Sequence, residues 1–275
     1  MNTMITLDEL KVVCPAAYSN DGAKHVSERY TPVRSADIVE KLVDQGFVIT
    51  HATQQKTQKA KAHKEAHQKH RIRLRLPGVA DNKSRGLGNV FPSIDLINSG
   101  DWSSKLMFAM GLYRMVCENG MIAPFAHGVA NTTINARHDN LGSVDWASID
   151  EAIKEAPKLF SFAGKCEDAV VSDHDQRAYA AEAARLRWDF EEDETPTKQH
   201  IDGLLRAHRE EDLAPTLWTL FNRVQENGTR GGVSVPSGEN RFRRVRARSN
   251  IKADLEWNQG LWTLTEDMLR AVSPN

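Results

Sequence analysis

Residues 71–76 read Arg-Ile-Arg-Leu-Arg-Leu, a strict alternation of basic and apolar side chains that ends at Pro77-Gly78. A period of two is typical of a β-strand with one buried face. Apolar runs at residues 47–50 (FVIT) and 89–98 (NVFPSIDLIN) predict a strand on either side of it. The sequence therefore predicts a β-hairpin with a long basic loop and a third strand, with the arginines on the exposed face.

A periodic apolar pattern follows the third predicted strand. Ser103 or Ser104 is suited to cap a helix, and Asn119-Gly120 is suited to end one. The apolar residues between them recur at helical spacing. The sequence therefore predicts a long helix here, with an apolar face made of Leu106, Met107, Met110, Tyr113, Met115 and Val116.

Helical patterns also dominate the second half of the chain. A short helix is expected at residues 37–45, a mostly helical region at 146–227, a strand at 241–251 and a closing helix at 255–271. Because proline disrupts a helix interior, breaks are expected at Pro157, Pro196 and Pro215.

This order of elements predicts an α+β fold. A small antiparallel sheet with a basic β-hairpin would pack on the long helix, and a mostly helical C-terminal half would follow. Residues 1–34 carry turn signals and are expected to be irregular. Residues 35–275 are expected to form a single α+β domain with a helical extension, with a possible internal boundary near residue 145.

The composition is that of an ordinary soluble protein. Of 275 residues, 40% are hydrophobic and 27% are charged, which argues against disorder. No apolar run is long enough to predict a transmembrane helix, and the N-terminal residues lack the basic start of a secretory signal. Three widely spaced cysteines fit a reducing compartment, so we expect a cytoplasmic protein with no membrane partner.

The charge is balanced in total but unevenly placed. Lys plus Arg is 36 and Asp plus Glu is 37, a net charge of −1. An acidic run, DFEEDE, occupies residues 189–194. Two basic blocks oppose it, and their candidate residues are Lys56, Lys59, Lys61, Lys64, Lys69, Arg71, Arg73 and Arg75 in the first and Arg241, Arg243, Arg244, Arg246 and Arg248 in the second.

Blocks of this kind favour phosphate binding, because Lys and Arg neutralise phosphates of nucleic acid. The alternative is that the lysine-rich run is a solvated loop. His63, His67 and His70 have a helical spacing that could hold zinc, but the basic surroundings repel a dication. The sequence has no P-loop, dinucleotide-binding or nucleophile-elbow motif, so we assign no cofactor, metal or catalytic residue. Trp102 is expected in the core, with base stacking as the alternative.

Two blocks, residues 91–122 and 217–232, resemble the phage/plasmid-like protein family, whose function is unknown and which is common on prophages and conjugative elements. The first block contains Asn98-Ser99 and Cys117-Glu118-Asn119-Gly120, and the second contains NRVQEN followed by glycines. The resemblance covers about residues 35–265. The predicted order of hairpin, strand and helix also resembles phage single-strand annealing recombinases. That resemblance implies a positively charged DNA groove, a ring of subunits and no need for ATP.

These observations lead to a mobile-element DNA-binding protein, in particular an ATP-independent factor that anneals single-stranded DNA in recombination. The expected partners are single-stranded DNA and further copies of the chain in a ring or filament. Two alternatives remain open: a protein-binding anti-defence or regulatory factor, and a metal-dependent nuclease. Whether the protein is an enzyme is undecided, and we lean towards a non-catalytic role.

Overall fold

Strand β2 (His70–Arg75) lies in the middle of an antiparallel sheet, between β1 (Val48–Gln54) and β3 (Val90–Asn98). β4 (Leu106–Arg114) follows β3 in the sheet, and β6 (Thr133–Ala136) pairs with β4. The register places Ile72 opposite Leu96 and Leu74 opposite Ile94. All four of these side chains are buried, as the alternating pattern requires. The three predicted strands are confirmed.

This computed structural model describes residues 4–20, 23, 33–56, 65–76, 90–114, 119–122, 133–136, 146–188, 190–191, 194–237 and 241–273. The chain forms two units. The first comprises Met1–Asp81, Phe91–Tyr113 and Phe125–Pro157, and the second Asn82–Val90, Arg114–Pro124 and Lys158–Asn275.

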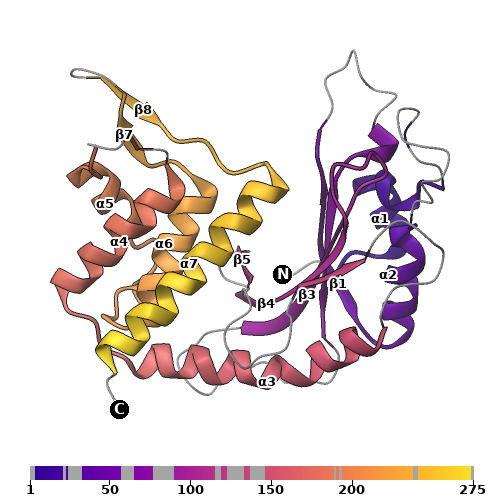
Figure 1. Cartoon of the computed structure of the whole chain (residues 1–275), viewed down its shortest axis with the longest axis horizontal. Coiled ribbons are helices and arrows are strands. Elements are labelled where there is room, and N and C mark those ends of the chain that lie inside the picture. Colours follow the sequence, from indigo (N-terminus) through magenta and orange to yellow (C-terminus); the bar gives the residue numbers. More distant parts are fainter. Residues whose placement is uncertain are drawn as a thin grey trace. The chain divides into compact units, whose positions relative to one another are not determined.

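Two helices of the first unit cover one face of the sheet (Figure 1). α1 (Leu7–Val13) packs against β1 and against a short 3-10 helix, η1 (Pro15–Tyr18), which in turn contacts α2 (Ser35–Asp44). α2 confirms the helix expected near residues 37–45. α1 lies in a segment expected to be irregular. It forms because Thr6 and Glu9 make a reciprocal capping box at its start.

The segment expected to form the long helix is strand β4, so that prediction is wrong. Every residue of β4 except Met107 is buried. Its neighbours in the sheet are β3, β5 and β6, so β4 lies inside the sheet, and the burial of successive side chains shows that both of its faces are covered. A strand buried on both faces is apolar throughout, and periodicity then does not distinguish it from a buried helix.

The helices of the second unit are α3 (Trp146–Asp168, which begins in the first unit), α4 (Asp173–Arg187), α5 (Lys198–Leu205), α6 (Leu217–Arg230) and α7 (Ile251–Val272). Pro196 and Pro215 lie between helices as predicted, but α3 continues through Pro157. The missing N–H of Pro157 removes one helical hydrogen bond. Ala156 and Leu159 on either side are buried, and their packing offsets that loss.

α6 is the central helix of the second unit and contacts α5, α7 and β5 (Asn119–Ile122). The apolar face expected for this helix is confirmed, since Leu217, Trp218, Leu220, Phe221 and Val224 are all buried. The hairpin of β7 (Ser234–Pro236) and β8 (Phe242–Arg244) leaves α6 and leads into α7. The strand expected at residues 241–251 is therefore limited to β8, and the predicted closing helix is confirmed.

Candidate functional site

The arginine face of β2 is not exposed in the way that its alternation predicts. Arg73 is 3% exposed, and its Nε and Nη2 donate to the two carboxylate oxygens of Asp95 in β3, at 2.6 and 2.7 Å. Burial alone would raise the pKa of Asp95, but the charge and hydrogen bonds of Arg73, together with Arg71, hold it below its ordinary value. The expectation of an exposed Arg73 is therefore wrong, because Asp95 in an apolar strand requires a buried partner.

The other basic residues of the first block are divided among different surroundings. Arg71 is partly exposed, with its Nε 3.9 Å from Asp95 Oδ2, and the Arg75 guanidinium lies 4.8 Å from the ring centre of Phe91. Lys69 is buried and Lys56 is exposed. Lys59, Lys61 and Lys64 lie outside the described residues. Of the five described members of this block, Lys56 alone is exposed.

The second basic block forms one strand of the β7–β8 hairpin and the segment behind it. Val245 N donates to Val233 O and Gly232 N donates to Val245 O, each at 2.8 Å, so the pairing continues to the end of α6. We call the five arginines of this block the arginine strip. Its members are Arg241, Arg243, Arg244 and Arg246, which are exposed, and Arg248, which is half-buried.

The exposed members of the arginine strip have no ion-pair partner among the described residues. Phe242 lies between two of them and is 60% exposed. Phe242 and Arg244 lie on one face of β8, and Arg243 lies on the other, opposite Val235. The strip therefore presents guanidiniums and an aromatic ring together.

Arg187, at the end of α4, lies against the root of this hairpin. Its Nε donates to Gly228 O at 2.7 Å and its Nη2 to Arg246 O at 3.3 Å. Burial first, and then the charges of Arg248 and Arg243, lowers the pKa of Arg187 to about 10. No motif in the sequence marks Arg187, because its position depends on helix α4 meeting a hairpin far away in the chain.

The acidic run lies between α4 and α5, as expected, and its described members Glu191 and Glu194 are exposed. His200, in the first turn of α5, is close to charges of both signs. Burial first and then Arg243 lower the pKa of His200, while Glu194 opposes them.

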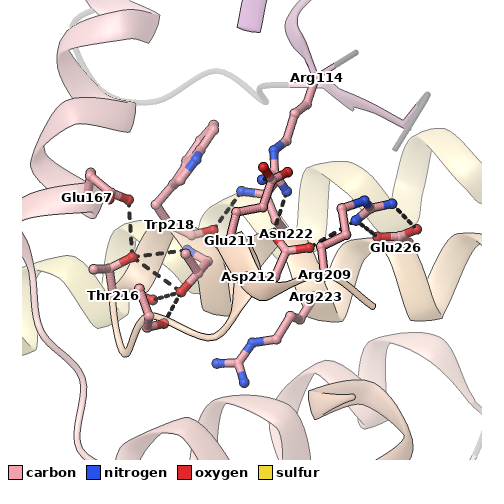
Figure 2. A network of polar contacts seen from close by, with 12 residues as sticks. Arg114, Glu167, Arg209, Glu211, Asp212, Thr216, Trp218, Asn222, Arg223 and Glu226 are labelled. Atoms are coloured by element: carbon pink, nitrogen blue, oxygen red, sulfur yellow. Dashed lines mark hydrogen bonds and ion pairs between the residues drawn. The ribbon is translucent and has the colours of Figure 1, made fainter. Parts of the chain in front are cut away.

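A buried ion network fixes the segment before α6 (Figure 2). Asp212 accepts hydrogen bonds from Arg114 Nη1 at 2.6 Å and Arg209 Nη1 at 2.9 Å. Arg209 also donates to both carboxylate oxygens of Glu226, at 2.7 and 2.8 Å. Glu211 and Arg230 complete the network at its exposed side. Three arginines face three carboxylates, so this network holds Arg114, the loop and α6 of the second unit together.

Polar residues of α6 also have structural partners. Asn227 Nδ2 donates to the carbonyl oxygens of Leu204 and Arg206 at 3.0 and 2.8 Å, which satisfies the end of α5. Gln225 Nε2 donates to Asn258 Oδ1 at 3.0 Å. The NRVQEN block that supports the family resemblance therefore contributes to packing within the second unit.

His70 and Ser35 form a buried pair in the first unit. Ser35 Oγ lies 2.8 Å from His70 Nε2, and His70 Nδ1 lies 3.0 Å from Gln68 O. The carbonyl can only accept, so Nδ1 carries the proton and Nε2 accepts from the serine hydroxyl. Both side chains are 1% exposed, and burial lowers the pKa of His70 to about 4. The pair has the atoms of a nucleophile and base, but it is closed to a substrate.

Other reactive groups in the described ranges include two buried cysteines, Cys14 and Cys166. Within those ranges, no group of three or more His, Cys, Asp or Glu side chains is placed to hold a metal ion. Cys14 is buried, and burial raises its pKa to about 12. No helix among the described residues is long and apolar enough to span a membrane.

The turn between β3 and β4 exposes one large aromatic side chain. Trp102 is 67% exposed and has φ of 65°, so its expected place in the core is wrong. The turn is held by Asn98, whose Nδ2 donates to Val33 O and Ser35 Oγ. Ser99 Oγ accepts from Ser104 N and donates to Ser104 O, which closes the turn.

Comparison with known proteins places the chain in a family without assigning an activity. The UPF0380 proteins YfjQ and YafZ of Escherichia coli (strain K12) are 29% and 30% identical to it over 269 residues, which cover 96% of this chain and 92% of each relative. No solved structure matches the chain. The family profile called domain of unknown function DUF932 matches residues 23–262, so the chain belongs to the DUF932 family.

Proposed function

We propose that the protein binds single-stranded DNA through the arginine strip and Phe242, and that it anneals complementary strands without ATP. The observation that carries this proposal is the exposed surface of residues 241–246, where four arginines surround one aromatic ring and no ion pair to a described residue neutralises them. The protein has a net charge of −1, so an attraction to DNA must arise from a local surface of this kind.

The two residue types of the strip have different uses in this proposal. Guanidiniums contact backbone phosphates and displace counterions, which supplies affinity without sequence preference. An exposed aromatic ring stacks on an unpaired base, and a duplex does not offer such a base. Phe242 therefore favours a single strand as the partner.

The family resemblance supports the setting of the proposed activity. Residues 91–122 and 217–232 resemble proteins common on prophages and conjugative elements, where strand annealing serves DNA recombination. We extend the proposal to a homo-oligomer, because annealing along a strand requires several copies side by side. The segregated acidic and basic segments, residues 189–194 and 241–248, support contacts between unlike surfaces of neighbouring copies.

Fluorescence anisotropy with a labelled single strand over a range of salt concentrations tests the binding. The test variant carries Arg241→Gln, Arg243→Gln and Arg244→Gln. The matched control carries Arg177→Gln, Arg185→Gln and Arg270→Gln, which remove the same charge from exposed helical positions. We expect the strip variant to lose affinity and to lower the salt slope by about 2, since each lost contact contributes roughly 0.7 on a single strand. The control should retain the slope.

An annealing assay with complementary oligonucleotides, without ATP, tests the activity. Faster annealing that the strip variant loses would support the proposal, and light scattering of the DNA complex would report its oligomeric state. Binding without annealing would reject the annealing role. Cleavage that requires Mg²⁺ and stops with a chelator would replace it with a nuclease. No binding at ~50 mM salt, where phosphate contacts are strong, would reject the DNA partner and favour an acidic protein.

A further inference from the structure

Two arginines meet at the root of the β7–β8 hairpin, and the charge of a third, farther along β8, acts on one of them. Arg187 comes from α4, Arg243 from β8, and Arg248 from the segment before α7. Arg187 Nε donates to the carbonyl oxygen of Gly228, and the Gly228 Cα faces the ring of Trp257, where an added Cβ would lie 2.2 Å from a ring carbon. The Arg248 guanidinium lies over the same ring, 5.5 Å from its centre. Gly228 and Trp257 therefore bring Arg187 and Arg248 together, and Arg243 acts on Arg187 through its charge.

The charges at this point are unbalanced. Arg243 and Arg248 are the cations that act on Arg187, and Asp254 is the carboxylate that acts on it among the described residues. Asp254 is itself buried in the first turn of α7. Glu256 also acts on Arg248, but it is exposed and lies 3.6 Å from Lys252. Three guanidiniums thus face one buried carboxylate, and gathering like charges is unfavourable unless an anion joins them.

Several hydrogen-bond donors at this point also lack an acceptor. Arg248 Nε, Trp257 Nε1 and Thr229 Oγ1 are buried and have no hydrogen-bond partner within the described parts of the chain. They belong to one neighbourhood, since Arg248 N donates to Thr229 O at 2.9 Å and Arg248 stacks on Trp257. Trp257 is only 1% exposed. Nine buried side-chain atoms of the described residues lack a partner, and three of them cluster here, where a single acceptor group could satisfy more than one.

We propose that Arg187, Arg243 and Arg248 form a phosphate-binding subsite at the root of the hairpin, and that this subsite holds one phosphodiester group of the bound single strand. A phosphate supplies several acceptor oxygens and negative charge, which are the two things that the site lacks. Arg248 Nη1 also donates to Ala253 O at 2.7 Å, so its guanidinium lies beside the first turn of α7, where the helix dipole favours an anion.

This inference rests on the proposed function and divides the strip into two parts. The exposed arginines at positions 241, 244 and 246 would contact the backbone as point charges. The subsite would hold a phosphate through several directed hydrogen bonds, and affinity there would depend on the guanidinium shape as well as on its charge.

The first arm of the test uses inorganic phosphate and the whole chain. Thermal unfolding is measured in phosphate and in chloride at equal ionic strength, for the wild type, Arg187→Lys and Arg185→Lys. Both variants keep the charge, and Arg185 lies in the same helix, exposed and 3.6 Å from Glu182. We expect phosphate to raise the melting temperature of the wild type and of Arg185→Lys but not that of Arg187→Lys. Equal stabilisation of all three would overturn the subsite.

The second arm measures single-strand DNA affinity of the same proteins and of Arg243→Gln. Arg187→Lys should weaken binding on the order of tenfold with an unchanged salt slope, because a charged hydrogen bond is lost while the charge is kept. Arg243→Gln should lower the slope by roughly 0.7. Melting temperatures in chloride identify a variant that has unfolded. If Arg187→Lys has unfolded, Arg243→Gln decides through its loss of the stabilisation by phosphate, because its effect on DNA binding is expected of the strip as well.

The outcomes separate this inference from the proposed function. DNA binding and phosphate stabilisation that Arg187→Lys leaves unchanged overturn the subsite while the strip stands. If phosphate stabilises the protein but single-stranded DNA does not bind, both the proposed function and the assignment of the subsite to a phosphodiester group are rejected. The subsite would then be a site for a free phosphate group. The subsite is supported if Arg187→Lys loses the stabilisation by phosphate and binds single-stranded DNA more weakly, while Arg185→Lys keeps both.

Discussion

The pairing of Arg73 with Asp95 shows how one acidic residue changes the use of a basic strand. The alternation in β2 predicts three equivalent arginines, but the carboxylate opposite the middle one draws it into the sheet. Asp95 also lies 3.9 Å from Arg71 Nε, so it compensates two cations. Sheet register, rather than phosphate binding, explains why Arg73 is present.

Asp95→Asn should therefore destabilise the protein strongly. It leaves Arg73 buried without its counter-charge, and breaking such a pair from one side costs about 3–5 kcal/mol of unfolding free energy. Chemical denaturation measures the change. Asp267→Asn is the control, because its pair with Arg270 is exposed and surface changes of this kind stay within about 0.5 kcal/mol. Equal effects of the two substitutions would show that the buried pair contributes nothing special.

His70 should make stability depend on pH. Its folded-state pKa is about 4, and the ordinary value is 6.5. Between these values the unfolded chain binds a proton that the folded protein does not bind. The unfolding free energy should therefore keep its full value above about pH 6.5. It should fall by about 3 kcal/mol as the pH drops to 4, because the unfolded chain gains the proton.

Denaturation at several pH values, on the wild type and on His70→Asn, isolates this contribution. The difference between the two proteins should shrink as the pH falls through that window. His174→Asn removes an exposed histidine and serves as the control. A His70→Asn protein that keeps the full pH dependence of the wild type would assign the effect to other groups.

At the scale of elements, two helical glycines differ in what surrounds them. A Cβ at Gly228 in α6 would lie 2.2 Å from the ring of Trp257, which is buried and cannot turn away. A Cβ at Gly260 in α7 would meet the flexible end of Leu186 at 3.3 Å. The first contact requires the helices to separate, while the second requires only a small side-chain shift.

Gly228→Ala should destabilise the protein by about 1–3 kcal/mol, as overpacking of a core does. Gly260→Ala should be neutral or stabilising by up to about 1 kcal/mol, because alanine favours the helix. Urea denaturation compares the two. If Gly228→Ala were as stable as Gly260→Ala, α6 and α7 would not pack closely at Trp257.

The sequence predicts elements well where one face is buried and poorly where both are. The alternation in β2 and the apolar face of α6 identify those elements directly. β4 is apolar on both faces and rich in helix-favouring Leu and Met, so its pattern alone points to a helix. Its strand form depends on pairing with β3 and β6, which a local pattern does not contain.

The candidate site is likewise predictable only where its residues are neighbours in the chain. The arginine strip is visible in the sequence because its members are adjacent in the chain. The sequence does not reveal Arg187 and Trp257 as members of the site. They are far from the strip in the chain and come close to it only through the packing of α4, α6 and α7. The burial of Arg73 likewise depends on the strand that carries Asp95, although a lone acid among apolar residues is a signal for a buried partner.

At the scale of the whole molecule, net charge and local charge make different predictions for DNA binding. The net charge is −1 with ten histidines, which gain protons below about pH 6.5. A protein attracted by its total charge would bind more tightly as the pH falls from 8.5 to 6. Arginines stay charged across this range. Single-strand affinity at constant salt should therefore change less than about threefold, and a tenfold rise at pH 6 would assign binding to histidines.

The strand form of β4 also bears on how the chain is made. Residues 106–114 leave the ribosome before β6 at residues 133–136, which later pairs with them. Their own preference in the meantime is helical. A nascent chain that stops between these segments offers only β3 as a partner, so residues 106–114 should hold a transient helix for part of the time and become a stable strand once β6 emerges. Chains released at that point would expose an apolar segment, and they are the species that chaperones and proteases should recognise.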